Sequence, residues 1–203
     1  MNIKLPQILL GLYIAEFVAL GIKPYNRGVW IAENIPIVLI VLFLTASYRR
    51  FKFSNTSYLL MSALVFLHTI GGYYTFERVP FGFATDVFGF TRNHYDRIAH
   101  FSVGFYAYPV AEYLRRKGLT ASKGLMAFAG ITAIFTVAAV YEIIEWLYSV
   151  SADPAAGIAF LGSQGDIWDA QKDMLSDGLG AVCAALFFLL KTTARGTGAP
   201  SSR

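Results

Sequence analysis

The chain has 203 residues, of which 56% are hydrophobic and only 15% are charged, and its net charge is +4. A soluble domain carries about 25% charged residues, so this composition excludes an ordinary soluble domain and predicts an integral membrane protein. The Lys and Arg residues lie in short loops between apolar runs, which gives no basis for a nucleic-acid partner.

A membrane-spanning helix needs about 20 largely apolar residues. We therefore predict an all-α, polytopic membrane fold, a single domain over residues 1–192, with about six transmembrane helices at 5–22, 30–48, 57–76, 96–115, 123–148 and 171–191. The first stretch resembles a signal peptide, but Glu16 interrupts it and no clear cleavage site follows, so we interpret it as a retained helix. The tail at 193–203 is rich in Gly, Ser, Thr and Pro, which predicts a disordered cytoplasmic segment.

The positive residues predict the orientation of these helices. The N-terminal flank, the loops around 49–52 and 115–123 and the C-terminal tail together carry 11 of the 17 Lys and Arg residues. Positive residues favour the cytoplasmic side of a membrane. We therefore expect both termini to be cytoplasmic.

Ionisable side chains interrupt the last four predicted helices. In chain order they are His68, Asp96, His100, Glu142, Glu145, Asp169, Asp173 and Asp177. The last three are spaced four residues apart, so they share one face of a helix. At about 1.5 Å per residue, His68, His100, Glu142 and Asp177 lie roughly 6–15 Å below the non-cytoplasmic helix ends. Unrelated ionisable residues would lie at different depths. Ionisable groups from four helices at one depth therefore predict a functional site.

Carboxylates packed this closely need a cation or protons. Carboxylate oxygens and imidazole nitrogens are ligands for zinc, manganese, iron or magnesium. All eight residues are therefore candidate ligands of a divalent metal. Within this set we predict catalytic or acid–base roles for His100, Glu142, Asp173 and Asp177.

Simpler structural roles are also compatible with several of these residues. Polar side chains such as His68 hydrogen-bond between membrane helices. Asp96 and Asp169 lie where a helix N-cap is expected. Glu33 is isolated in the second helix, and the pattern gives it no role.

Arg92 and Arg97 flank the start of the fourth predicted helix. As basic residues they are candidate partners for the packed carboxylates. Arginine equally binds phosphate through paired hydrogen bonds, so we predict that these two residues bind substrate. The loop before them is rich in Phe and Gly, which is typical of a loop on the bilayer surface and compatible with an entry for an amphiphilic molecule. The expected partners are membrane lipids and a lipid-linked substrate.

Four segments together resemble the YjdF-type family of bacterial inner-membrane proteins of unknown function. They are HTIGGYYTF from His68, RNHYDRIAHF from Arg92, EIIEW from Glu142 and DAQKDMLSDGLGA from Asp169. The resemblance covers about residues 25–192. It implies a multi-pass protein of the inner membrane and no established activity.

The second half also resembles the VanZ-like pattern. Asp96, Arg97, His100 and Phe101 are similar to its first motif, but Glu145 stands where that pattern has Gln and Asp177 where it has Asn. These two departures make the site more acidic, which favours a cation. The resemblance implies work at the cell envelope.

The resulting hypothesis is a metal-dependent hydrolase or transferase that acts on a lipid or lipid-linked envelope molecule. A non-catalytic, ion-coupled transporter is an alternative, because intramembrane carboxylates also relay protons or cations. A transporter needs polar groups towards the cytoplasmic side as well, and there the last four predicted helices carry almost none besides Glu112. The third alternative is a structural or envelope-stress protein whose polar network specifies helix packing.

Overall fold

The computed structural model describes residues 4–151 and 163–194, and the residues it describes are helical or lie in turns between helices. The helices are α1 (Leu5–Gly21), α2 (Arg27–Ser47), α3 (Asn55–Tyr74), α4 (Gly82–Phe88), α5 (Tyr95–Val103), α6 (Ala107–Arg116), α7 (Lys123–Ser151) and α9 (Asp169–Ala194), with 3₁₀ turns at Gly104–Tyr106 and Ser163–Gly165. The predicted all-α fold is confirmed. Most of the predicted tail lies outside the described residues.

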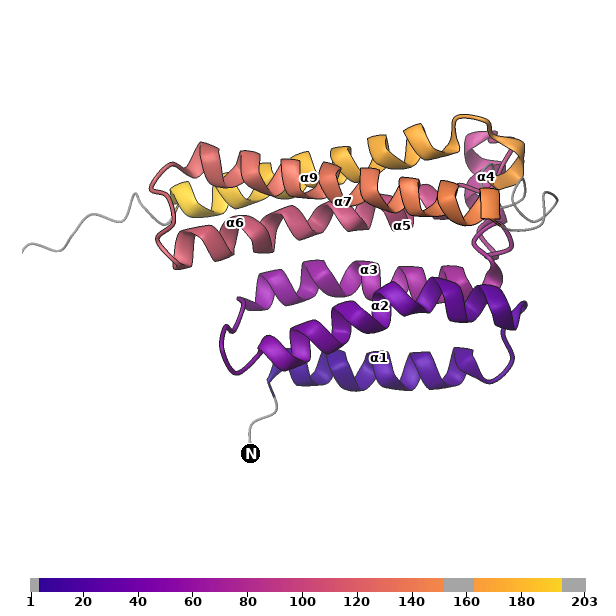
Figure 1. The fold of residues 1–203 in the computed structure, drawn as a ribbon, viewed down its shortest axis with the longest axis horizontal. Helices are drawn as coiled ribbons and strands as arrows, with labels where there is room; N and C mark the ends of the chain where they lie inside the picture. Colours follow the sequence, from indigo (N-terminus) through magenta and orange to yellow (C-terminus); the bar gives the residue numbers. More distant parts are fainter. Residues whose placement is uncertain (1–3, 152–162, 195–203) are drawn as a thin grey trace, which may run out of the picture.

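The long helices form two groups that run side by side (Figure 1). The first contains α1, α2 and α3, and the second contains α5, α6, α7 and α9. Helix α3 joins the groups by packing against α5 and α6. Two tyrosines tie this contact, because the Tyr95 hydroxyl donates to the Leu67 carbonyl at 2.8 Å and the Tyr106 hydroxyl to the Met61 carbonyl at 3.1 Å.

Three of the described helices are long and apolar enough to cross a membrane, namely Arg27–Ser47, Lys123–Ser151 and Asp169–Thr193. Leu5–Gly21 is a shorter apolar helix. The remaining predicted spans coincide with α3 and with the α5–α6 pair. Helix α4 lies within the Phe-rich loop, at the end of the bundle where α7 ends and α9 begins (Figure 1). We call this the α4 end and the opposite one the α6 end.

The fourth predicted helix is not continuous. It breaks into α5, a 3₁₀ turn at Gly104–Tyr106, and α6. Pro109 has no backbone N–H and so leaves the Phe105 carbonyl without its usual α-helical donor. A short 3₁₀ turn is a common way of tightening a helix at such a point.

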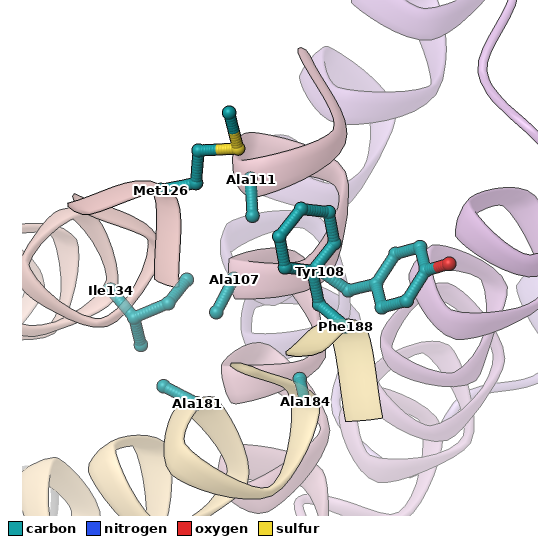
Figure 2. Packing of buried hydrophobic residues seen from close by; sticks show 8 residues of the cluster. All are labelled: Ala107, Tyr108, Ala111, Met126, Ile134, Ala181, Ala184 and Phe188. Carbon is teal, nitrogen blue, oxygen red and sulfur yellow. The ribbon is translucent and has the colours of Figure 1, made fainter. Parts of the chain in front are cut away.

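A hydrophobic core fills the space between α6, α7 and α9 (Figure 2). Its small members, Ala107 and Ala111 on α6 with Ala181 and Ala184 on α9, are almost completely buried. Small residues at membrane helix interfaces let backbones approach and pack tightly. Phe188 fills the remaining space and is 1% exposed.

Two glycines bring α9 still closer to the α5–α6 pair. A Cβ atom added at Gly180 would collide with the backbone carbonyl oxygen of Phe101. A Cβ atom added at Gly104 would collide with the backbone of Asp177 and Ala181. This approach places the polar start of α9 directly against α5.

Glu112 organises the α6 end. It is buried, and it accepts hydrogen bonds from the Ser54 backbone N–H at 2.9 Å, the Ser54 hydroxyl at 2.8 Å, the Ser57 hydroxyl and Arg116 at 3.0 Å. Ser54 is also the N-cap of α3. This one carboxylate therefore fastens the start of α3 to the end of α6.

Replacing Glu112 with alanine should lower the free energy of unfolding by about 3 kcal/mol, because the Ser54 and Ser57 donors would lose a charged acceptor. Thermal unfolding in detergent, followed by tryptophan fluorescence, measures this loss. The exposed Glu77, whose carboxylate forms an ion pair with its neighbour Arg78 at 3.4 Å, provides the control. If Glu112→Ala and Glu77→Ala unfold at the same temperature, the fastening role is wrong.

Candidate functional site

Two arginines on the α5 side meet three aspartates on the α9 side. Arg97 forms ion pairs with Asp169 and Asp173. The Arg92 Nη1 atom lies 2.9 Å from Asp166 and 3.2 Å from Asp169. All five side chains are largely buried. The aspartates of α9 are therefore partly neutralised by protein cations, and this network fastens α5 to α9.

Asp166 lies in the turn that leads into α9. Its carboxylate accepts a hydrogen bond from Lys172 at 2.7 Å, and this bond is the largest cause lowering the pKa of Asp166 to about 2. Asp166 is therefore ionised at any pH above about 2. The turn thus presents a permanent negative charge to Arg92.

His100 lies one turn deeper along α5 and faces Asp177. The His100 Nδ1 atom is 3.2 Å from the Asp177 carboxylate. Asp177 is 1% exposed. A carboxylate only accepts hydrogen bonds, so this contact places a proton on Nδ1. In the neutral imidazole the lone pair is then on Nε2, which points away from Asp177.

Two other carboxylates surround that lone pair. The His100 Nε2 atom is 3.8 Å from Asp96 and 3.6 Å from Asp173, which is too long for hydrogen bonds. One ligand atom from each of these three residues lies within 4.8 Å of the others. The set combines one imidazole nitrogen with two carboxylate oxygens, which is a donor set that divalent metals accept.

Glu142 and Glu145 approach the same cluster from α7. Glu142 interacts electrostatically with Asp173 and His100. Glu145 interacts electrostatically with Glu142 and His100. Within residues 4–151 and 163–194, neither glutamate side chain makes a hydrogen bond or an ion pair. They are thus the carboxylates of the cluster with free lone pairs.

His68 makes its polar contacts with α2 rather than with the other predicted ligands. Its Nε2 atom is 3.2 Å from the Glu33 carboxylate and 3.1 Å from the Glu33 carbonyl oxygen on α2. The Phe76 ring covers it edge-on, with the ring centroids 5.0 Å apart. His68 therefore joins α3 to α2, and its role as a metal ligand stays a prediction.

The two predicted phosphate-binding arginines differ in how many unpaired hydrogen-bond donors they have. Arg97 is committed to aspartates. The buried Nε and Nη2 atoms of Arg92 have no partner among the described residues. Arg92 is therefore better suited than Arg97 to bind an anion.

Glu33 and Tyr141 are residues near the site that the sequence pattern did not assign. Glu33 pairs with His68, and Tyr141 lines an apolar groove together with His100 and Asp177. The available signal for Glu33 was an acidic residue inside an otherwise apolar helix, which indicates a buried partner. An aromatic residue in an apolar helix, such as Tyr141, carries no comparable signal.

Comparisons with known proteins place the chain within a family. Residues 5–194 match the family model described as "Predicted membrane protein (DUF2238)". The chain is 34% identical over 173 residues to inner membrane protein YjdF of Escherichia coli (strain K12), covering 82% of this chain and 80% of that protein. No solved structure matches the chain. The VanZ-like pattern stays a prediction.

Proposed function

Because this chain belongs to the DUF2238 family of predicted membrane proteins, we propose that it is a multi-pass protein of the bacterial inner membrane that uses a divalent metal to hydrolyse, or to transfer a group on, a lipid or lipid-linked envelope molecule. The inner-membrane location is supported by the similarity to the Escherichia coli protein. The excess of basic residues at the α6 end supports cytoplasmic termini, which would place the site on the opposite side.

The arrangement of His100 carries the proposal. Metal-binding histidines almost always donate their other ring N–H to a carboxylate, a backbone carbonyl or water, which fixes the tautomer and orients the ring. Asp177 provides such an acceptor at 3.2 Å from Nδ1, and it is buried. Nε2 is thereby left to bind a metal together with Asp96 and Asp173.

The unpaired glutamates would supply the proton chemistry. A metal bound by His100, Asp96 and Asp173 would lower the pKa of a bound water and polarise an ester or phosphoryl oxygen. Glu142 or Glu145 would take the proton of the attacking water and return one to the leaving oxygen. Arg92 would bind a phosphate of the substrate through its two unpaired nitrogen atoms.

The α6 end gives no support to an ion-coupled transporter. Its only buried carboxylate among the described residues, Glu112, is occupied by Ser54, Ser57 and Arg116. A relay across the membrane is expected to continue as a chain of polar groups towards the other side. The one-sided polar cluster therefore favours chemistry at the α4 end.

Metal content of the purified protein, measured by elemental analysis, tests the proposal. Wild type is expected to hold a stoichiometric divalent metal, and His100→Ala to lose it. His94→Ala is the matched control, because His94 lies at the N-cap of α5 and contacts Phe90 rather than the cluster. With metal present, wild type and His94→Ala should convert a lipid in a bacterial lipid extract, and His100→Ala should be about 100-fold slower or worse.

Two results would count against this function. One is wild-type protein with no divalent metal and an unfolding temperature unchanged by a chelator. The other is equal metal content and equal turnover in His100→Ala and His94→Ala. In either case the His100 cluster has only a packing role.

A further inference from the structure

An apolar groove of about 950 Å³ leads away from the candidate site. It is lined by α2, α3, α5, α6 and α7, together with Asp177 of α9. Ile40 and Phe43 form part of its α2 wall, and Val137 lies on its α7 wall. Helices α2 and α7 belong to different helix groups (Figure 1), and residues of both line the groove.

The two ends of the groove differ in chemistry. His68, His100 and Asp177 line one end, and these residues belong to the polar centre or adjoin it. Most of the remaining lining is aliphatic or aromatic until the groove reaches Arg50 and Lys117 at the α6 end. A molecule with a polar head at His100 and a long apolar remainder fits this lining.

The length of the groove matches a lipid tail. His100 and Lys117 are 17 positions apart along α5 and α6, which is roughly 25 Å at about 1.5 Å per residue. The hydrocarbon core of a bilayer is about 30 Å thick, so each leaflet contributes roughly 15 Å. The groove can therefore hold the whole length of a tail.

We infer that the groove binds the apolar tail of the substrate, and that the substrate is an amphipathic membrane lipid whose headgroup lies at His100. This inference rests on the proposed function for the reaction at the headgroup, but the binding of the tail is a separate property. Lipid would enter sideways from the bilayer between α2 and α7. Headgroup chemistry then occurs at His100 without removing the tail from an apolar environment.

Two valines on α7 provide a matched test. Val137 lines the groove and is 57% exposed, whereas Val140 is 52% exposed and is not part of its lining. Tryptophan at position 137 would project into the groove and narrow it, whereas tryptophan at position 140 would leave it unchanged. Wild type, Val137→Trp and Val140→Trp are reconstituted into vesicles of equal parts phosphatidylethanolamine and phosphatidylglycerol, extracted into detergent, and weighed by native mass spectrometry.

Wild type and Val140→Trp are expected to retain lipid, and Val137→Trp to bind it about tenfold more weakly, because lost tail contacts lower the affinity. Unfolding temperatures of the two variants confirm that both are folded. The inference is overturned if wild type retains no lipid, or if both tryptophan variants retain it equally.

Retention in His100→Ala separates this inference from the proposed function. Retention at the wild-type level, combined with wild type that holds no metal, would leave the groove inference standing and remove the metal-dependent reaction. If wild type holds a metal but Val137→Trp and Val140→Trp retain lipid equally, the metal-dependent reaction stands and the groove inference is removed.

Discussion

Gly180→Ala is expected to destabilise the protein by about 3 kcal/mol, more than most single substitutions do. The added methyl group would collide with the carbonyl oxygen of Phe101, and backbone atoms on both helices have to move to make room. That movement would separate α9 from α5 and with it Asp177 from His100. The variant should therefore unfold at a lower temperature and also lose metal.

Gly11→Ala is the control for that substitution. Gly11 lies inside α1, and no atom is within 4 Å of an added Cβ there. Alanine is a better helix former than glycine by about 1 kcal/mol, so this variant should be unchanged or slightly more stable. Equal stability of Gly180→Ala and wild type would show that α9 does not need this close approach.

Arg97→Met is expected to cost about 3–5 kcal/mol of folding free energy, because removing one partner of a buried ion pair leaves the other charge uncompensated. The Arg97 side chain is 12% exposed, and Asp169 and Asp173 are both more than nine-tenths buried. Denaturant unfolding in mixed micelles measures the loss. The effect should be partly reversed by adding Asp173→Asn, since the double variant buries less unpaired charge.

Lys172→Ala is the matched control, because this lysine also pairs with an aspartate of the network. Its side chain is 51% exposed, and exposed ion pairs contribute about 0–1 kcal/mol. Similar losses in Arg97→Met and Lys172→Ala would indicate that water screens the arginine network. Failure of Asp173→Asn to restore any stability would contradict the pairing between α5 and α9.

The sequence predicted the helices well because each one combines length with apolar character. It also predicted that α5 and α9 carry facing polar groups, since Asp173 and Asp177 share one face at four-residue spacing. The break in the α5–α6 pair was missed, because a single Pro109 inside an apolar run often leaves a membrane helix continuous. The short α4 was missed because its sequence matches that of a loop.

A single sequence offers candidate pairs but does not show which of them form. Arg97 was predicted either to pair with the carboxylates or to bind phosphate; it pairs with aspartates 72 and 76 positions away, and phosphate binding stays a prediction. Glu33 and His68 are likewise 35 positions apart, and no local spacing links them. Such partners are chosen by helix packing, which depends on side-chain shape along the whole interface.

The arginine network has a consequence for biosynthesis. Arg97 is made 76 residues before Asp173, and ribosomes add about 5–20 residues per second, so roughly 4–15 seconds pass before that partner exists. During this interval Arg97 has only Asp96 beside it, at 3.7 Å. We therefore expect α5 to reach its final packing only after α9 has been made, so that the last helix completes assembly of the membrane domain.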